Sequence, residues 1–369
     1  MRFFLAIFIT LHVQSSLAES VTIEAAFGDS LGLSESVAAT PLTSPTQDTG
    51  YDLRCDGLGT AFCQGQAGIK FYSFEDDPTF LKMKAELVAR NVPLVGGVKD
   101  RYAVEYVSRL EGELLNRIGT TTGKLKADLD KLLTRLPEVW PGTPEEKGLV
   151  RAAVAKASIL SLGELLTALW KDGEAENFIK FYTKMFVSTC NKENGPAVFS
   201  YNAFKLDNVN FITKAPIVPG LGDKLVIYCP AVILSAHQNS NDLTQLLDVL
   251  TFVLGHELTH IVDVTQKPQL YGQFPACIKK SYTFPLSEAA LSLKELSADV
   301  GGIHLILDRF KGRTHVDTYQ SLRKVLAPFL CLNKLPQSFS RKRLDVFGRN
   351  PEVIKALGCQ GKTVPLCHQ

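Results

Sequence analysis

The chain has 369 residues, of which 45% are hydrophobic and 21% charged, and its formal net charge at pH 7 is +2. This length is enough for one large domain or two smaller ones. The small net charge argues against a nucleic-acid partner bound through charge, and the one dense basic run, "RKR" at 341–343, is typical of a solvated face.

The first 18 residues have the pattern of a secretory signal peptide. A positive Arg2 precedes the apolar run "FFLAIFITL", and "SSLA" supplies small residues before a predicted cleavage after Ala18. No later segment has about 18 uninterrupted apolar residues, so we expect no membrane span in the mature chain and a secreted, extracellular protein. Residues 19–50 are rich in Ser, Thr, Ala and Gly, and we expect a flexible leader there.

Eight cysteines are spread widely along the chain. An even number in a secreted chain predicts four disulfide bonds. The absence of a C-x-x-C pair argues against a structural zinc cluster. Spacing alone leaves the connectivity open.

Residues from about 78 to 190 are predicted to be helical. Apolar residues recur there at helical spacing, as in the leucines at 125, 129, 132 and 136, and "PGTP" at 141–144 breaks the run. We therefore assign residues 51–195 to a helical region that precedes a second domain at 196–369.

The pattern changes after Cys190. "AVFSYNAF" and "KLVIYC" are β-branched and aromatic, which predicts two strands joined by a long loop. Two helices are predicted to follow, at about 241–265 and 286–310. The fold class expected from these elements is mainly α with a small β-sheet (α+β).

The first of these two helices carries "HELTH". His256 and His260 are one turn apart and share a helix face, so both imidazoles can reach one tetrahedral ion. Glu257 lies about 100° around the helix, where it can act as general base toward water that attacks a carbonyl. Two histidines four apart also occur by chance on apolar helices, so the pattern alone leaves both interpretations open.

The second helix offers the third ligand that a catalytic zinc ion needs. In "KELSADVGG", Glu295 and Asp299 are four apart on one face. Glu295 completes a His2Glu set, and Asp299 can fix the tautomer of a ligand histidine, as Asp263 can also do. A solvated helix face is the alternative interpretation of the carboxylates. Gly301 and Gly302, in mid-helix, indicate close packing of the two helices.

These blocks together resemble the neprilysin and endothelin-converting-enzyme family of zinc metallopeptidases, which are gluzincins. "VLGHELTHIVD" is similar to the family's zinc helix and "ELSADVGG" to its third-ligand helix. "YNAF" followed by "LVIYCPAVIL" resembles its substrate strand and the segment after it. The similarity covers about residues 196–310. It implies a gluzincin-like zinc peptidase domain at 196–369, with one Zn²⁺ per chain and peptide substrates.

The resemblance implies a role for each matching residue. His256, His260 and Glu295 would be zinc ligands, Glu257 the general base, and Asp299 the partner of a zinc histidine. The other implied roles concern the substrate: Asn202 and Ala203 would hold its main chain, and Ile233 and Val253 would line a pocket for a hydrophobic residue after the scissile bond. Ordinary core packing is the alternative for the last two.

The cysteines are also similar to those of the family. By analogy, Cys55 would pair with Cys359, Cys63 with Cys331, and Cys277 with Cys367, which leaves Cys190 for Cys229. Such bridges would join the start of the mature chain to its end.

The sequence departs from the family in two ways. The family chain is about twice as long, so only a reduced cap lobe can form here. The oxyanion histidine is missing from "KLPQSFSRKRLD", although Arg343, or Arg341 in another register, matches the family's substrate-binding arginine. Removing one oxyanion donor typically lowers turnover about 100–1,000-fold. We therefore predict a secreted zinc endopeptidase that cleaves on the amino side of hydrophobic residues. The alternative is a catalytically weak homologue that binds and sequesters peptides.

Overall fold

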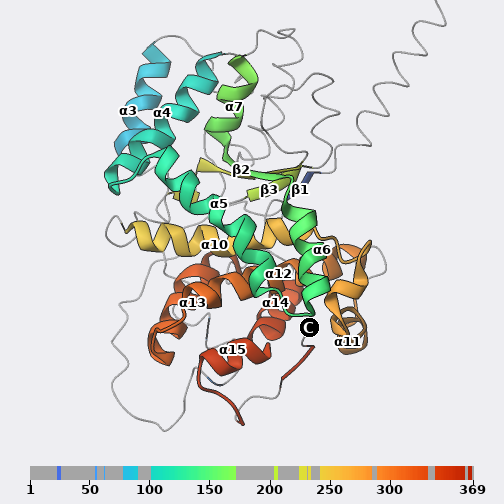
Figure 1. The fold of residues 1–369 in the computed structure, drawn as a ribbon. Coiled ribbons are helices and arrows are strands. Elements are labelled where there is room, and N and C mark those ends of the chain that lie inside the picture. The colour runs from blue at the N-terminus through green and yellow to red at the C-terminus, as the bar shows by residue number, and fades with distance from the viewer. Residues whose placement is uncertain are drawn as a thin grey trace, which may run out of the picture.

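The computed structural model describes residues 23–25, 55, 62, 78–89, 101–171, 203–206, 224–230, 232–233, 242–284, 289–330, 337–361 and 365–367. The predicted signal peptide at 1–18 and Asn202 lie outside these residues. Helices predominate in the described part, and one small sheet lies among them (Figure 1). The prediction of a mainly helical fold with a small β-sheet is therefore confirmed.

Five helices are described in the N-terminal half: α3 (Pro78–Ala89), α4 (Arg101–Arg117), α5 (Thr122–Val139), α6 (Pro144–Val154) and α7 (Leu162–Lys171). Helix α5 buries the four leucines that the helical spacing singled out. The predicted break at "PGTP" is confirmed, because α5 ends at Val139 and α6 begins at Pro144. Thr143 caps α6 in a reciprocal capping box with Glu146, which explains why the chain restarts as a helix there.

The sheet contains strands β1 (Ile23–Ala25), β2 (Ala157–Ser161), β3 (Ala203–Leu206) and β4 (Lys224–Tyr228), in the spatial order β1-β3-β4-β2. β3 pairs antiparallel with both β1 and β4, whereas β2 and β4 are parallel. β4 lies within the second predicted strand, and β3 overlaps the end of the first, whose residues 197–202 lie outside the described residues. The prediction of helix throughout 78–190 is wrong at β2, because a short buried apolar run looks alike in a strand and in a helix.

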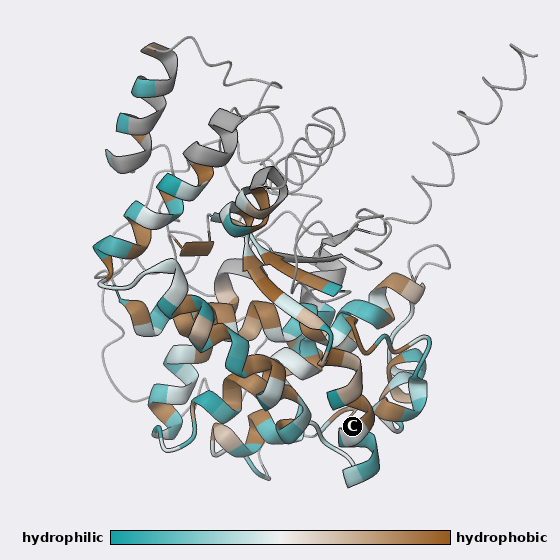
Figure 2. Ribbon diagram, turned by 45° about the horizontal axis from the view of Figure 1, so that its top comes forward, coloured by the Kyte–Doolittle hydropathy of each residue, from teal (hydrophilic) through white to brown (hydrophobic). Residues whose placement is uncertain are grey.

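The C-terminal half is helical around one pair of central helices. It contains α10 (Leu243–His260), α11 (Phe274–Ser281), α12 (Ala289–Arg309), α13 (His315–Leu330), α14 (Gln337–Gly348) and α15 (Pro351–Ala356), with the short 3-10 helix η4 at Pro268–Tyr271. α10 packs along α12 and also contacts α5, β3 and β4. Hydrophobic residues gather where these elements meet (Figure 2), and they form one continuous core with the buried side chains of α4 to α7. The helical region and the C-terminal half are thus built on a shared core.

Two disulfide bonds are described, Cys55–Cys359 and Cys277–Cys367. Both pairings implied by the family resemblance are confirmed. Cys229 is also disulfide-bonded, while Cys63, Cys190 and Cys331 lie outside the described residues. The Cys55–Cys359 bond joins the N-terminal part of the folded chain to its C-terminal end. Both bonds are consistent with an oxidising compartment.

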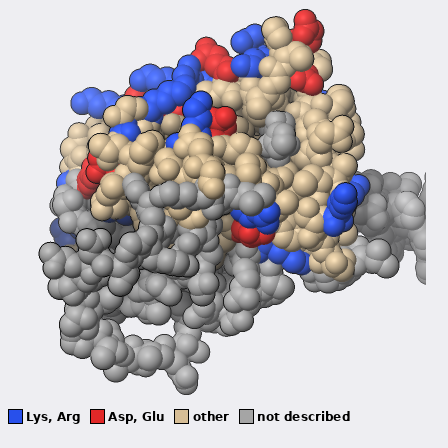
Figure 3. All heavy atoms as spheres, turned by 90° about the horizontal axis from the view of Figure 1, so that it is seen from below, with Lys and Arg blue, Asp and Glu red and all other residues tan. Residues whose placement is uncertain are grey.

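The surface of the described part carries charges of both signs. In the view from below, Lys and Arg side chains alternate with Asp and Glu (Figure 3), in keeping with the small net charge. None of the helices described here combines the length and the apolar character needed to cross a membrane.

Candidate metal centre

The "HELTH" motif lies at the end of a helix that is buried on nearly all sides. α10 begins behind Asp242, whose side chain accepts a hydrogen bond from the Thr244 N–H. The apolar run "LLDVLTFVL" then supplies the buried surface that holds the helix in the core. Within this environment His256 and Glu257 have no solvent exposure, and His260 has almost none. Buried imidazoles and carboxylates are costly unless they are paired or bind an ion.

Glycines bring α12 close enough to complete the cluster. A Cβ atom on Gly255 would lie 3.1 Å from the Gly302 Cα atom, and one on Gly302 would lie 2.9 Å from the Phe252 backbone oxygen. A Cβ atom on Gly301 would collide with the Thr259 hydroxyl. The predicted close packing of the two helices is confirmed, and Gly255 is a third participant that the sequence analysis missed.

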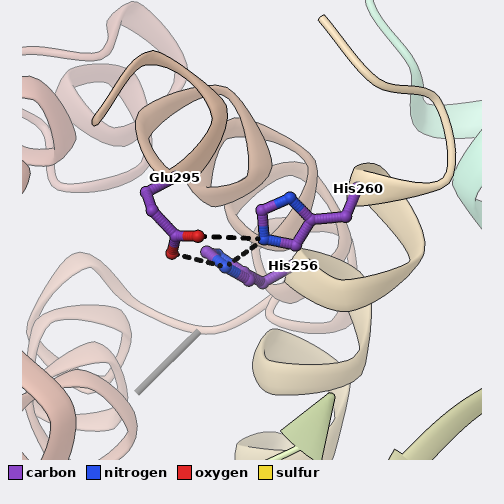
Figure 4. Close-up of side chains that lie close together, drawn as sticks. All are labelled: His256, His260 and Glu295. Carbon is purple, nitrogen blue, oxygen red and sulfur yellow. Dashed lines mark hydrogen bonds and ion pairs between the residues drawn. The ribbon is translucent and has the colours of Figure 1, made fainter. Parts of the chain in front are cut away.

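Three side chains converge at this crossing (Figure 4). The Nε2 atoms of His256 and His260 are 3.0 Å apart. The Glu295 carboxylate lies 3.3 Å from the first and 3.4 Å from the second. An ion held tetrahedrally at about 2.1 Å from each ligand atom sets those atoms about 3.4 Å apart. The spacing of the three groups therefore suits a metal ion of that size, and together they form a possible metal site.

Asp299 determines how His256 faces this site. Its Oδ1 atom lies 2.9 Å from His256 Nδ1. Because an ionised carboxylate only accepts hydrogen bonds, Nδ1 carries the proton, and the lone pair of Nε2 points toward the other two groups. A histidine in this tautomer is ready to act as a ligand.

Arg343, on α14, fixes Asp299 in turn. Its side chain is buried, so the prediction of a solvated face for "RKR" at 341–343 is wrong for this residue. Its Nε donates to Oδ2 over 2.8 Å and its terminal nitrogen Nη2 to Oδ1 over 2.7 Å, with both residues buried. A guanidinium that grips a carboxylate at two points restrains its orientation as well as its charge. The chain Arg343–Asp299–His256 thus runs from α14 through α12 to α10.

The pKa values of both carboxylates in the cluster are lowered, which favours their ionised forms. Burial alone would raise the pKa of Glu295, but the charges and hydrogen bonds of His260 and His256 lower it far below its usual range. Burial would likewise raise the pKa of Asp299, but Arg343 and His256 lower it. For His256, burial lowers the pKa, yet the hydrogen bonds to Asp299 and Glu295 raise it to about 9.

Glu257 is buried beside the cluster. Burial lowers the pKa of Arg343, but the charges of Asp299, Glu295 and Glu257 raise it overall. Glu257 is therefore near enough to the Arg343 guanidinium to affect it. Glu257 is thus a buried carboxylate that directly follows His256 in the chain and is shielded from solvent.

The remaining predicted residues lie in the core, in the sheet or just after α10. Ile233 and Val253 are fully buried in the common core, which agrees with core packing and leaves a pocket role untested. Ala203 begins β3. The Asp263 carboxylate accepts hydrogen bonds from Thr265, and Asp299 is the carboxylate that lies at hydrogen-bonding distance from His256. No side chain is described for Arg341.

A separate cleft of about 810 Å³ lies between the ends of α5 and α12 and the start of α13. His304, which lies on α12 beyond Asp299, lines this cleft rather than the metal-binding cluster. Basic side chains in its wall are held by carboxylates: Arg135 pairs with Asp308, and Arg313 with Asp248.

Comparison with known proteins adds no relative to this picture: the chain matches no protein-family model, no curated protein sequence and no solved structure. The possible metal site is therefore identified by the geometry of His256, His260 and Glu295.

Proposed function

We propose that the chain is a secreted zinc-dependent endopeptidase with a neprilysin-like, gluzincin-type catalytic centre. The observation that supports this best is the buried set formed by His256, His260 and Glu295, whose ligand atoms are spaced for one tetrahedral ion. A set of two histidines and one glutamate is typical of catalytic rather than structural zinc sites.

The donor atoms suit zinc. Two neutral imidazole nitrogens and one carboxylate oxygen would hold the ion, and Asp299 would keep His256 in the required tautomer. When bound, zinc would act as a Lewis acid that polarises a peptide carbonyl and makes water nucleophilic near neutral pH. A set of three protein ligands leaves a fourth position for that chemistry.

Glu257 has the role of general base in this proposal. One of its carboxylate oxygens would take a proton from the attacking water and deliver it to the nitrogen of the leaving amine. The burial of Glu257 and its neighbours keeps bulk water away from the transferred proton. Arg343 would hold Asp299, and through it His256, and would also face the substrate from the side of Glu257.

The substrate would be an extended peptide. Asn202 and the backbone of Ala203 would bind its main chain, and Ile233 and Val253 would border a pocket for a hydrophobic residue just after the cleaved bond. The catalytic domain would comprise residues 196–369, and residues 51–195 would form a reduced cap lobe. The pairing of β2 with β4 and the contacts of α5 with α10 and α12 support a helical region built directly onto that domain.

Metal analysis tests the ligand set. We expect about one zinc ion per chain in the purified protein and its loss in His260→Ala. His315→Ala is the control, because His315 bonds the Ala356 carbonyl away from the cluster. Equal zinc content in His260→Ala and wild type would contradict the assignment.

Hydrolysis of a quenched peptide library tests the activity. Glu257→Gln keeps the size of the side chain and removes the base, so turnover should fall by about 100–10,000-fold while zinc content holds. A chelator should abolish the wild-type activity. If wild type and Glu257→Gln turn over peptides equally slowly but bind them in a zinc-dependent way, the chain is instead a peptide-sequestering homologue.

A further inference from the structure

The outer edge of β3 is covered by the N-terminal segment of the same chain. β1 pairs antiparallel with β3, and Ile23 lies opposite Leu206, Glu24 opposite Lys205, and Ala25 opposite Phe204. On its other side β3 pairs with β4. β1 is only three residues long, and it lies inside the segment that the sequence analysis expected to be a flexible leader.

The edge that β1 covers has the chemistry of a peptide-binding site. Without β1, β3 would be the outer strand of the sheet, and its outward N–H and C=O groups would form a template for another extended chain. A peptide that added antiparallel to β3 would run in the same direction as β1 does. The N-terminal segment and such a peptide would therefore use the same hydrogen-bonding groups.

The position of this edge connects it to the candidate metal centre. β3 packs against α10, the helix that carries His256 and His260 (Figure 1). β1 runs along β3 from Leu206 toward Phe204, which places its C-terminal end nearest to Ala203. Ala203 is the residue whose backbone is proposed to hold the substrate main chain.

We propose that Ile23–Ala25 is an internal occupant of the substrate-binding edge, so that peptides must displace this strand before they bind. That the edge of β3 binds substrate rests on the proposed function. That Ile23–Ala25 covers this edge rests on the observed pairing of β1 with β3. Its consequence is an autoinhibited chain whose peptide affinity depends on the segment just after the predicted signal peptide.

The pairing is short enough to be displaced. Three register positions supply only a few backbone hydrogen bonds, each of modest net strength. Tethering compensates, because a segment of the same chain competes at an effective concentration in the millimolar range. If the covered state outweighs the open one by roughly tenfold, the apparent affinity for an added peptide falls by about the same factor.

Proline substitution within the full chain opens the edge selectively. Of two adjacent residues in an antiparallel strand, one directs its N–H toward the partner, so Glu24→Pro/Ala25→Pro removes a ladder donor whichever residue supplies it. Thr43→Pro is the matched control, because it places a proline in the same N-terminal segment outside β1. Zinc content and thermal melting of each variant report whether the folded protein is intact.

Two readouts test the proposal. The first is the KM for a quenched peptide, which should fall roughly 3–30-fold in Glu24→Pro/Ala25→Pro with kcat unchanged, and stay at the wild-type value in Thr43→Pro. The second is binding of a fluorescent synthetic peptide with the sequence of residues 19–29, measured by anisotropy. This peptide should bind the proline variant more tightly than wild type. A version of the peptide with prolines in place of Glu24 and Ala25 should not bind.

The outcomes separate this proposal from the proposed function. An unchanged KM together with equally weak binding of the synthetic peptide to wild type and variant would overturn the strand proposal. If no form of the protein hydrolyses peptides, the peptidase assignment fails. Anisotropy then still decides whether the N-terminal sequence occupies the edge.

Discussion

Arg343 and Asp299 form a bidentate ion pair that is shielded from solvent on both sides. The pair joins α14 to α12, and the second function of Asp299 is to accept the Nδ1 proton of His256. One carboxylate therefore links a structural contact of the C-terminal helices to the orientation of a metal-binding side chain. This arrangement makes Arg343 a positioning residue for the side chain of His256.

We predict that Arg343→Lys impairs both stability and metal binding. Lysine keeps the charge but cannot grip Asp299 at two points, and a disrupted buried pair typically costs about 3–5 kcal/mol of unfolding free energy. Loosening the carboxylate that orients His256 should weaken zinc binding by about 10–100-fold. Denaturant titration and competition with a zinc-binding dye measure the two effects.

The control for this substitution is Arg109→Lys. Arg109 pairs with Glu86 and Glu113 on the surface, where an ion pair contributes little to stability because water screens both charges. Equal effects of the two substitutions on zinc affinity would show that the chain from Arg343 to His256 does not support the site.

The glycine contacts between α10 and α12 give a second prediction. In Gly302→Ala the new methyl group would meet the Phe252 backbone oxygen at 2.9 Å, which cannot move without shifting α10. Overpacking of this kind costs about 1–3 kcal/mol and should separate Glu295 from the two histidines. We therefore expect lower stability and reduced zinc content, measured by chemical denaturation and metal analysis.

Gly148→Ala is the matched control for Gly302→Ala. Gly148 lies in the interior of α6, and a Cβ atom there would have no neighbour within 4 Å. The substitution should stabilise the protein by up to about 1 kcal/mol, because alanine is the better helix former. A Gly302→Ala protein as stable as Gly148→Ala would mean that the helices do not pack as closely as the structure shows.

The metal-binding residues were predictable because they depend on helix periodicity. Spacings of four residues put His256 above His260, and Glu295 above Asp299, independently of the rest of the fold. The partner of Asp299 was not predictable in this way, since Arg343 reaches it from a helix that no local pattern connects to α12. The resemblance suggested a substrate-binding role for Arg343, and the structure adds the buried ion pair.

The sheet was predictable only in part. β3 and β4 stood out through their β-branched and aromatic residues, whereas β2 was hidden within a helical stretch because its five residues, "ASILS", show no clear period. Its strand conformation comes from parallel pairing with β4, a contact between distant segments. β1 depends in the same way on an edge offered by β3, which its own composition does not reveal.

The disulfide between Cys277 and Cys367 gives a third prediction. It spans 90 residues of sequence, and closing a loop of that length restricts the unfolded chain by about 4–5 kcal/mol in the entropic account. Cys277→Ser/Cys367→Ser should lose a large part of this stability, as measured by denaturation under non-reducing conditions. A loss below about 1 kcal/mol would mean that the bond does not stabilise the folded chain.

The last prediction concerns Glu111, a fully buried carboxyl group far along the chain from the metal-binding helices. Its side chain accepts hydrogen bonds from the Ser161 hydroxyl and the Gly163 N–H, and so ties α4 to the junction of β2 and α7. Burial raises its pKa to about 8, against the lowering effect of these two hydrogen bonds, and the nearby charge of Glu164 adds to the rise. Tyr228, also buried, has its own pKa raised by burial and by Glu111.

The sign of the pH dependence follows from the raised pKa. In the unfolded chain Glu111 titrates near 4.5, so between that pH and about 8 the folded state keeps a proton that the unfolded state loses. The protonated group contributes fully to the free energy of unfolding below about pH 4.5. This contribution declines as pH rises and is lost above about pH 8. At about 1.4 kcal/mol per pKa unit, the contribution of Glu111 to the free energy of unfolding changes by roughly 5 kcal/mol over this pH range.

We therefore expect the unfolding free energy of the wild type to fall between pH 5 and pH 9 more steeply than that of Glu111→Gln, because glutamine resembles the neutral acid and does not titrate. Urea titrations at several pH values measure the two slopes. Glu113→Gln is the control, since Glu113 is a partly exposed residue of the same helix paired with Arg109, and it should leave the wild-type slope intact. Parallel slopes for wild type and Glu111→Gln would show that Glu111 is already ionised in the folded protein, and that Ser161 and Gly163 stabilise its charge enough to outweigh burial.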